Sequence, residues 1–269
     1  MKIKITHSTT YKYSSMVPRL IQCLKLFPSV CDNQEIIEWK TFSSSGKILE
    51  SHIDALGHRI QNIFINNFRG QLKITSQGIL KTKDLSGVVK GLKEKVNPLC
   101  FLRETDLTKP CENIERISVN AKKKKKNQIE FAHELNLIVS NSINYESGST
   151  TTSTSSEDAL IQKKGVCQDF AHILISAARF NQLPARYVNG FLLEETVSGE
   201  NTTHAWVEIF INNLGWVAFD PSHKKCIDDK YIRISTGFDF EDASIIKGVK
   251  NNYNGDEYLN TKVDIENCQ

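Results

Sequence analysis

Gly165-Val-Cys-Gln-Asp-Phe-Ala-His172 is the most informative segment of this chain, because it places a cysteine at the start of a helical pattern. Phe170, Leu174 and Ala177 recur at steps of three and four residues, which is the apolar stripe of a helix. The Cys167 thiol is therefore expected in the first helical turn, where unpaired backbone N–H groups and the positive helix end favour the thiolate. The thiolate is the nucleophilic form, so Cys167 is a candidate nucleophile.

Two residues that could complete a nucleophilic site follow in order. His204 begins an alternating apolar run that is typical of a strand, and Asp220 ends the next such run. The segment Asn212-Asn-Leu-Gly215 between the runs predicts a hairpin turn. In a hairpin that turns there, positions 204 and 220 lie at the same open end, within reach of a His–Asp hydrogen bond.

The chemistry needs these three residue types together. An imidazole takes the thiol proton and leaves a thiolate–imidazolium pair, and a carboxylate on the other ring nitrogen fixes the tautomer and orientation. Each residue alone has a simpler interpretation: a small buried apolar cysteine, a structural histidine beside a tryptophan, and an aspartate in a turn before proline. The order Cys167, His204, Asp220 on helix, strand and strand favours the catalytic interpretation.

Other side chains near the nucleophile have weaker assignments. His172 lies five positions after Cys167, about 140° further round the helix, so a packing or hydrogen-bonding role is expected. The Cys167 backbone N–H is a candidate oxyanion donor. Gln168 and Tyr145 are the candidates for a second donor, and the residues alone do not choose between them.

Composition bounds the class of protein. The chain has 269 residues with 39% hydrophobic and 24% charged residues, which is ordinary for one large or two modest globular domains. The net charge of +3 is too small to require a nucleic-acid partner. The basic run 122–126 is expected to be a solvated loop or a helix end.

The seven cysteines show neither a CxxC pair nor regular spacing, which favours free thiols in a reducing compartment over a disulfide framework. The N-terminus alternates like a strand and lacks the apolar core of a signal peptide, and no apolar run approaches the ~18 residues of a membrane span. We therefore expect a cytoplasmic protein without a membrane partner.

The pattern of elements predicts an α+β protein in three parts. Residues 1–80 read as short strands separated by turns, which is typical of a small sandwich domain. Residues 81–127 are Lys-rich and interrupted by prolines, so a connector with short helices is expected. Residues 128–269 read as helices followed by antiparallel strands and form the predicted catalytic core.

The sequence resembles the transglutaminase-like superfamily, and specifically its bacterial cysteine proteases, over nearly the whole chain. The motifs that carry the resemblance in the core are Gly165-Val-Cys-Gln-Asp-Phe-Ala-His172, Leu183-Pro-Ala-Arg-Tyr-Val-Asn-Gly190, Thr203-His-Ala-Trp-Val-Glu208 and Gly215-Trp-Val-Ala-Phe-Asp-Pro221. Outside the core they are Tyr11-Lys-Tyr13, Gln22-Cys-Leu24, Asp54-Ala-Leu-Gly57, Tyr231-Ile-Arg-Ile234 and Lys247-Gly-Val249. The chain departs from the family pattern at Gly237-Phe-Asp-Phe240, Asn189 and Phe191, which affects expectations about substrate recognition rather than the triad.

The resemblance implies a papain-like core, with the cysteine helix packed on an antiparallel sheet, preceded by a β-rich N-terminal domain. It implies acyl transfer through a thioester, with Cys167 as nucleophile, His204 as base and Asp220 as orienting acid, and it requires neither a metal nor an organic cofactor. Hydrolysis of a protein or peptide amide is the leading expectation. Amine-accepting transglutaminase activity and a catalytically idle binding module are the alternatives. The sequence carries no signal of oligomeric state.

Overall fold

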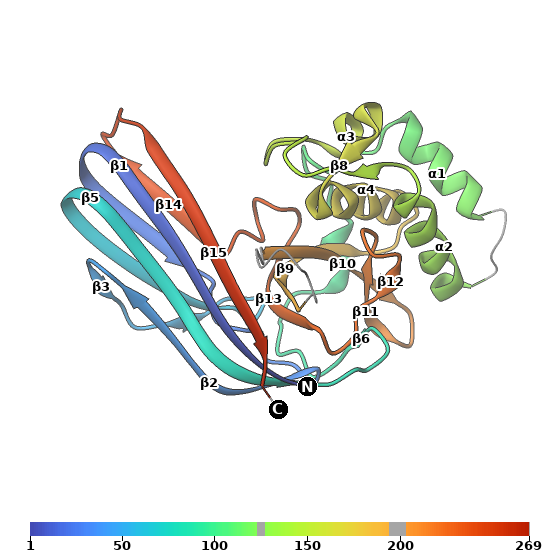
Figure 1. The fold of residues 1–269 in the computed structure, drawn as a ribbon. Helices are drawn as coiled ribbons and strands as arrows, with labels where there is room; N and C mark the ends of the chain where they lie inside the picture. The colour runs from blue at the N-terminus through green and yellow to red at the C-terminus, as the bar shows by residue number, and fades with distance from the viewer. Residues whose placement is uncertain (123–126, 194–202, 269) are drawn as a thin grey trace.

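The computed structural model describes residues 1–122, 127–193 and 203–268. Its α+β architecture consists of a long β-sandwich beside a core of helices and a second sheet (Figure 1). Most of the expected basic run, Lys123–Lys126, lies outside the described residues, and Lys122 is the last residue of a helix. Within the described ranges, none of the helices has the length and apolarity that crossing a membrane would need.

The sandwich is built on two strands that each cross both of its layers. Its strands are β1 (Lys2–Leu24), β2 (Gln34–Ser43), β3 (Lys47–Ile48), β4 (His52–Ile53), β5 (Arg59–Thr82), β14 (Ile246–Asn251) and β15 (Glu257–Asn267). The register of β1 against β5 shifts between Tyr13 and Val17. Gln22 Nε2 donates to Tyr13 Oη at 3.4 Å, although a straight strand would separate residues nine apart by about 30 Å. The strand therefore folds back on itself, and the two halves enclose an apolar interior.

The sandwich agrees with the β-rich domain expected at residues 1–80, but it also contains strands from the C-terminal part of the chain. The sequence predicts a catalytic core over residues 128–269, but within that range β14 and β15 pair with the second and first halves of β1. The physical reason is the exposed edge of β1, whose backbone N–H and C=O groups need a partner along their whole length. Val263 and Ile265 on β15 also bury their side chains in the sandwich interior.

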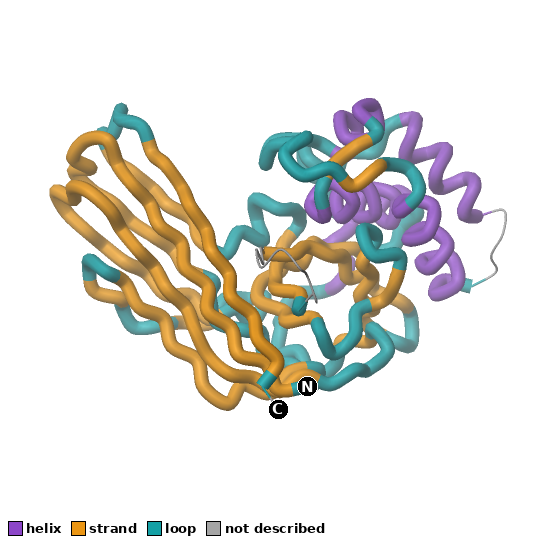
Figure 2. The backbone as a smooth tube through the Cα atoms, viewed as in Figure 1, coloured by secondary structure: helices purple, strands orange, loops and turns teal. Residues whose placement is uncertain are grey.

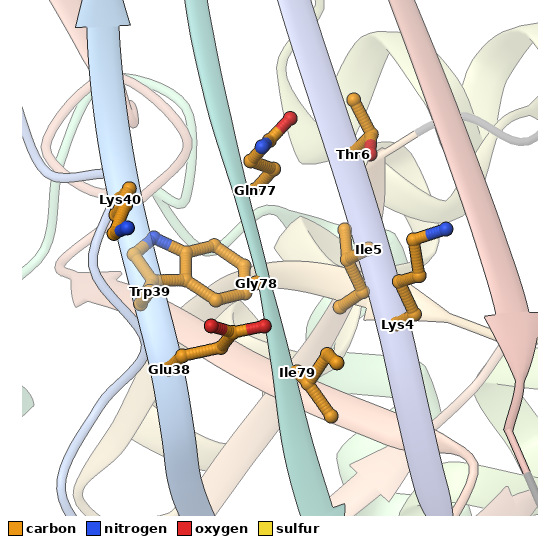
Figure 3. A pocket seen from close by; sticks show the side chains of 9 residues that line it. All are labelled: Lys4, Ile5, Thr6, Glu38, Trp39, Lys40, Gln77, Gly78 and Ile79. Carbon is orange, nitrogen blue, oxygen red and sulfur yellow. The ribbon is translucent and has the colours of Figure 1, made fainter.

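A close approach between β2 and β5 shows how tightly one layer packs. Figure 3 shows the Trp39 indole lying over Gly78, at a small cavity of about 150 Å³. A Cβ at Gly78 would lie 2.2 Å from the Glu38 carbonyl oxygen, so only glycine fits there. The indole N–H donates to Leu26 O at 2.9 Å, which joins the layer to the chain leaving β1.

The core combines a six-stranded sheet with helices over one face. Its strands, in the order β12-β11-β10-β9-β13 with β6 beside β11, are β6 (Val88–Val89), β9 (Ala185–Leu192), β10 (Thr203–Ile211), β11 (Gly215–Asp220), β12 (Lys225–Cys226) and β13 (Tyr231–Gly237). The helices are η1 (Pro98–Leu102), α1 (Glu112–Lys122), α2 (Gln128–Ser140), α3 (Ser156–Gln162) and α4 (Cys167–Phe180). The short strands β7 (Asn144–Tyr145) and β8 (Lys164–Gly165) pair in parallel just before α4. Figure 2 shows the helices gathered on one side of this sheet.

Helix α1 belongs to this core although it lies in the segment expected to be a connector. Ile114, Ile117 and Ala121 are buried on one side of α1 and join the same apolar cluster as Leu174 of α4. Because an amphipathic helix must bury its apolar face, the core begins before residue 128.

Candidate active site

Cys167 is the first residue of α4, and the turn that presents it is held by one carboxylate. Asp169 Oδ2 accepts from Val166 N and from Thr150 Oγ1, each at 2.7 Å. A Cβ at Gly165 would lie 2.6 Å from this carboxylate, so glycine allows Asp169 to fold back over the start of the helix. Burial raises the pKa of Asp169. The thiol itself is half-buried and so remains accessible.

His204 and Asp220 lie at neighbouring ends of β10 and β11, as the hairpin predicts. The strands are antiparallel, with Val207 opposite Phe219, so Asp220 lies diagonally across from His204. His204 Nε2 and Asp220 Oδ2 are 2.7 Å apart, and the carboxylate is fully buried. The bond to Nε2 leaves Nδ1 as the ring nitrogen for a second partner.

That second partner is Cys167, and the structure brings all three predicted residues together. Burial favours a neutral ring, but hydrogen bonds from His204 to Asp220 and to Cys167 outweigh it and raise the pKa of His204 to about 10. The imidazole therefore stays protonated at neutral pH, beside the Cys167 sulfur.

Both carboxylate oxygens of Asp220 accept several hydrogen bonds. Its Oδ2 atom contacts His204, His223 Nδ1 at 2.9 Å and Tyr231 Oη at 2.8 Å. Its Oδ1 atom accepts from Ser222 N at 2.9 Å and Ser222 Oγ at 2.6 Å. Burial would raise the pKa of this carboxyl, but the hydrogen bonds and charges of both histidines hold it far below its usual range. The side chain is thus a fixed anion beneath the His204 ring.

Tyr231, Ser222 and His223 are parts of the site that sequence reasoning missed. Ser222 and His223 follow an Asp-Pro step, and their backbone N–H groups donate to Asp220 Oδ1. Because aspartate commonly accepts hydrogen bonds from N–H groups two or three residues on, the sequence of this turn could have predicted these contacts. Tyr231 carried no such signal, because its contact depends on β13 lying beside β9, far from β11 in the chain.

The weaker candidates make contacts of other kinds. His172 is fully buried, accepts from Phe240 N at 3.2 Å and has its pKa lowered to about 4 by burial, in keeping with the expected packing role. Gln168 Nε2 donates to Thr152 O at 3.3 Å. Tyr145 stacks on Phe170 and is 58% exposed. Neither contact assigns the second oxyanion donor.

Three side chains at the site also have the chemistry of metal ligands. In the described parts of the chain, ligand atoms of His204, Asp220 and His223 lie within 4.8 Å of one another. One carboxylate oxygen already bridges the two rings through hydrogen bonds of 2.7 and 2.9 Å, so the cluster forms a closed hydrogen-bonded network.

Comparisons with known proteins agree with this architecture. A model of the transglutaminase-like superfamily matches residues 115–221, and a model of the bacterial transglutaminase-like N-terminal region matches residues 3–81. The start of the first match within α1 agrees with the place of that helix in the core.

Relatives and a solved structure cover different shares of the chain. An uncharacterized protein of Mycobacterium bovis is 30% identical over 147 residues, which are 51% of this chain and 47% of the relative, so the match spans about half the relative's length. An uncharacterized protein of Mycobacterium leprae is 26% identical over 265 residues, 92% of each chain. The crystal structure of a proposed cysteine protease from Cytophaga hutchinsonii superposes with a TM-score of 0.77 at 22% identity, covering 99% of this chain and 90% of that one.

These matches span both the sandwich and the core with its Cys167, His204 and Asp220 cluster. The chain belongs to the transglutaminase-like superfamily and carries the bacterial N-terminal region of that group.

Proposed function

We propose that this protein is a cysteine-dependent acyl-transfer enzyme that hydrolyses peptide or isopeptide amides. The observation that carries the proposal is the convergence of three side chains: His204 Nε2 lies 2.7 Å from the fully buried Asp220 carboxylate, and hydrogen bonds to Asp220 and Cys167 raise the pKa of His204 to about 10. A protonated imidazole beside a sulfur is the resting state of a thiolate nucleophile. The similar fold of the Cytophaga protein, named a proposed cysteine protease, supports the same class.

The first half of the reaction forms a thioester. The Cys167 thiolate attacks the amide carbonyl carbon, and its electron pair becomes the new S–C bond while the carbonyl oxygen takes the negative charge. The His204 imidazolium then gives its proton to the amide nitrogen, the C–N bond breaks, and the amine leaves. Asp220 keeps Nε2 hydrogen-bonded throughout, so the ring stays oriented with its other nitrogen toward sulfur.

The oxyanion needs hydrogen-bond donors, and the helix start supplies one. As the first residue of α4, Cys167 has no carbonyl one turn earlier within the helix to accept its backbone N–H. That N–H is the proposed donor, and the positive end of the helix favours the same charge.

The second half of the reaction decides between hydrolysis and amine transfer. Neutral His204 removes a proton from water, which attacks the thioester and releases the acid and the thiolate. An amine that reached the thioester first would give a new amide instead, the outcome of a transglutaminase. Incubating the protein with a glutamine-containing peptide and a labelled amine, and comparing label incorporation with free acid formed, distinguishes the two.

The nucleophile is tested by thiol labelling. Under limiting iodoacetamide at neutral pH, Cys167 should be alkylated before the other six cysteines, and His204→Ala should remove this advantage. Cys167→Ala should abolish the fast label, whereas Cys23→Ala, a half-buried cysteine of the sandwich, should leave it intact. Labelling spread evenly over the cysteines in the unaltered protein would contradict the proposal.

A further inference from the structure

A cleft of about 320 Å³ lies where the sandwich meets the core. Its walls come from β1 and β15 on one side and from Asn189 of β9 and Thr203, the first residue of β10, on the other, with residues 244–246 also lining it. Figure 1 shows β15 running along the side of the sandwich that faces the core. The volume is at the lower end of the ~300–1,000 Å³ that is usual for ligand sites.

The sandwich wall of this cleft is polar where packing alone would make it apolar. Every odd-numbered residue from Ile3 to Tyr13 on β1 is buried. Four of these positions carry isoleucine or tyrosine, and the two that interrupt them are His7 and Thr9, both of which line the cleft. Thr9 Oγ1 is 3.4 Å from His7 Nε2, so the two form one polar strip.

Two buried polar atoms in the cleft wall have no hydrogen-bond partner among the described residues. They are His7 Nδ1 and Asn189 Oδ1, on side chains of residues that are only 1% and 6% exposed. Leaving such an atom unpaired destabilises the fold. Two of them in one cleft, one from each domain, indicate that a ligand supplies the missing partners. Asn189 offers a donor and an acceptor side by side, the arrangement that matches a peptide amide.

The cleft adjoins the candidate active site. Thr203 lines it and directly precedes His204, and Asn189 pairs with Ala205 on the neighbouring strand. On the helix side the cleft is bounded by Phe240, whose ring packs edge-on against Tyr187 at 6.2 Å. Tyr187 belongs to the apolar cluster against which Cys167 packs, so this wall continues toward the nucleophile.

The residues that line the cleft favour an uncharged ligand group. The described residues of the cleft include neither a lysine, an arginine, an aspartate nor a glutamate. Burial lowers the pKa of His7 to about 4, so its ring is neutral at physiological pH. An ionic group entering this cleft would lose its hydration without gaining a partner.

We propose that this interdomain cleft binds the uncharged residue of a peptide substrate next to the scissile amide, with Asn189 and the His7–Thr9 strip pairing with its backbone amide. The N-terminal sandwich thereby determines substrate specificity. The assignment of a peptide amide rests on the proposed function, whereas the preference for a neutral group rests on the cleft itself.

Binding is measured without catalysis, in the full chain carrying Cys167→Ala. The probes are N-acetylated, C-amidated tripeptides that differ only in a central leucine, lysine or glutamate, titrated by calorimetry. We expect the leucine peptide to bind at least about tenfold more tightly than the other two. Equal affinities, tighter binding of a charged peptide, or no detectable binding of any of them would overturn the proposal.

Variants in the same Cys167→Ala background locate the binding. Asn189→Leu and Thr9→Val should each weaken the leucine peptide at least about fivefold. The thermal stability of Asn189→Leu should stay equal or rise, because this change removes a poorly paired buried polar group, whereas Thr9→Val also removes the 3.4 Å partner of His7 Nε2 and should lower stability slightly. Thr10→Val, on the opposite face of β1, is the matched control and should leave affinity unchanged. Unchanged affinity in both cleft variants would overturn the site.

The two proposals fail in different ways. Cleft-dependent binding in the Cys167→Ala protein, together with an inert thiol in the unaltered protein, would refute the proposed enzyme and leave the cleft assignment standing. A fast-labelling Cys167 with no cleft-dependent binding would refute the cleft assignment alone.

Discussion

The hydroxyl of Tyr231 donates a 2.8 Å hydrogen bond to Asp220 Oδ2, the same oxygen that contacts His204. Tyr231 begins β13, which borders β9 rather than β11 in the sheet, so the bond ties a third strand to the carboxylate that orients the imidazole. A group held in this way has little freedom to rotate away from the histidine, which is what an orienting residue requires.

Removing this donor should slow catalysis without unfolding the protein. Tyr231→Phe keeps the ring, which packs edge-on against Trp206 at 5.4 Å, and deletes one hydrogen bond to a charged group. We expect kcat per titratable thiol to fall about tenfold with KM unchanged. Tyr258→Phe, at a residue that is 62% exposed, is the control and should have no effect. A change in KM alone would show that Tyr231 acts on substrate binding instead of on Asp220.

The protonated state of His204 predicts an unusually alkaline limit to amide cleavage. The pKa of His204 in the folded protein is about 10, above the ordinary value of 6.5. The imidazole therefore keeps its proton through neutral pH and loses it only as pH rises through about 10. Because the leaving amine needs this proton, peptide cleavage should decline near pH 10. Alkylation by iodoacetamide needs only the thiolate and should not decline there.

Asp220→Asn supplies the matched variant for this pH profile. The amide removes the negative charge that holds the His204 proton, so the alkaline limb should move to lower pH and cleavage at neutral pH should fall. The prediction fails if peptide cleavage declines at the same alkaline pH in Asp220→Asn and in the unaltered protein. It also fails if cleavage and alkylation decline together in the unaltered protein.

A buried ion network in the core sheet should control stability in acid. Glu208, on β10 with His204, contacts Arg186 Nε at 2.6 Å and Arg233 Nε at 2.7 Å. Burial opposes its ionisation, but the two arginines lower its pKa to about 2, below the ordinary 4.5. The resulting stability is therefore present above pH 4.5 and is lost as pH falls toward 2, by at most about 3 kcal/mol.

Glu208→Gln tests this network directly. It leaves two buried arginines with a neutral partner, so the free energy of unfolding at neutral pH should fall by about 3–5 kcal/mol. Glu112→Gln, which breaks an exposed pair with Arg116, should change little. Denaturant titrations at neutral and acid pH measure both, and the gap between Glu208→Gln and the unaltered protein should narrow in acid. A constant gap would show that the charge of Glu208 does not contribute.

Close backbone packing beside His204 makes Gly190 hard to replace. Gly190 pairs with His204 across β9 and β10, and a Cβ there would lie 2.1 Å from Ile232 O and 2.5 Å from Trp206 Cη2. Gly190→Ala should lower the free energy of unfolding by about 1–3 kcal/mol, because neither the backbone nor the indole can move freely. Gly248→Ala is the control, since its Cβ would meet only the end of the Gln22 side chain, at 3.0 Å. Equal losses in the two variants would contradict this account.

Local patterns in the sequence were enough to locate the three residues of the candidate site. Cys167 follows a glycine at the start of a strongly periodic helix, and His204 and Asp220 lie on two strands joined by a short turn. Turn length and strand period fix which ends of a hairpin meet, so the His–Asp contact could be inferred without coordinates. The structure brings Cys167 to the same pair, and the α+β class and the transglutaminase-like family are confirmed.

Contacts between segments distant in the chain were decided only by the tertiary structure. Residues 246–267 return to cover the edge of β1, Tyr231 contacts Asp220 because of the order of strands, and His7 and Asn189 line the same interdomain cleft. A period of two or of 3.6 residues says which face of an element is buried and does not say against what. The partner of each face depends on all the apolar faces and unpaired strand edges that must be covered at once. For that reason the sequence was enough to predict the candidate site residues, whereas the contacts around them depended on the tertiary structure.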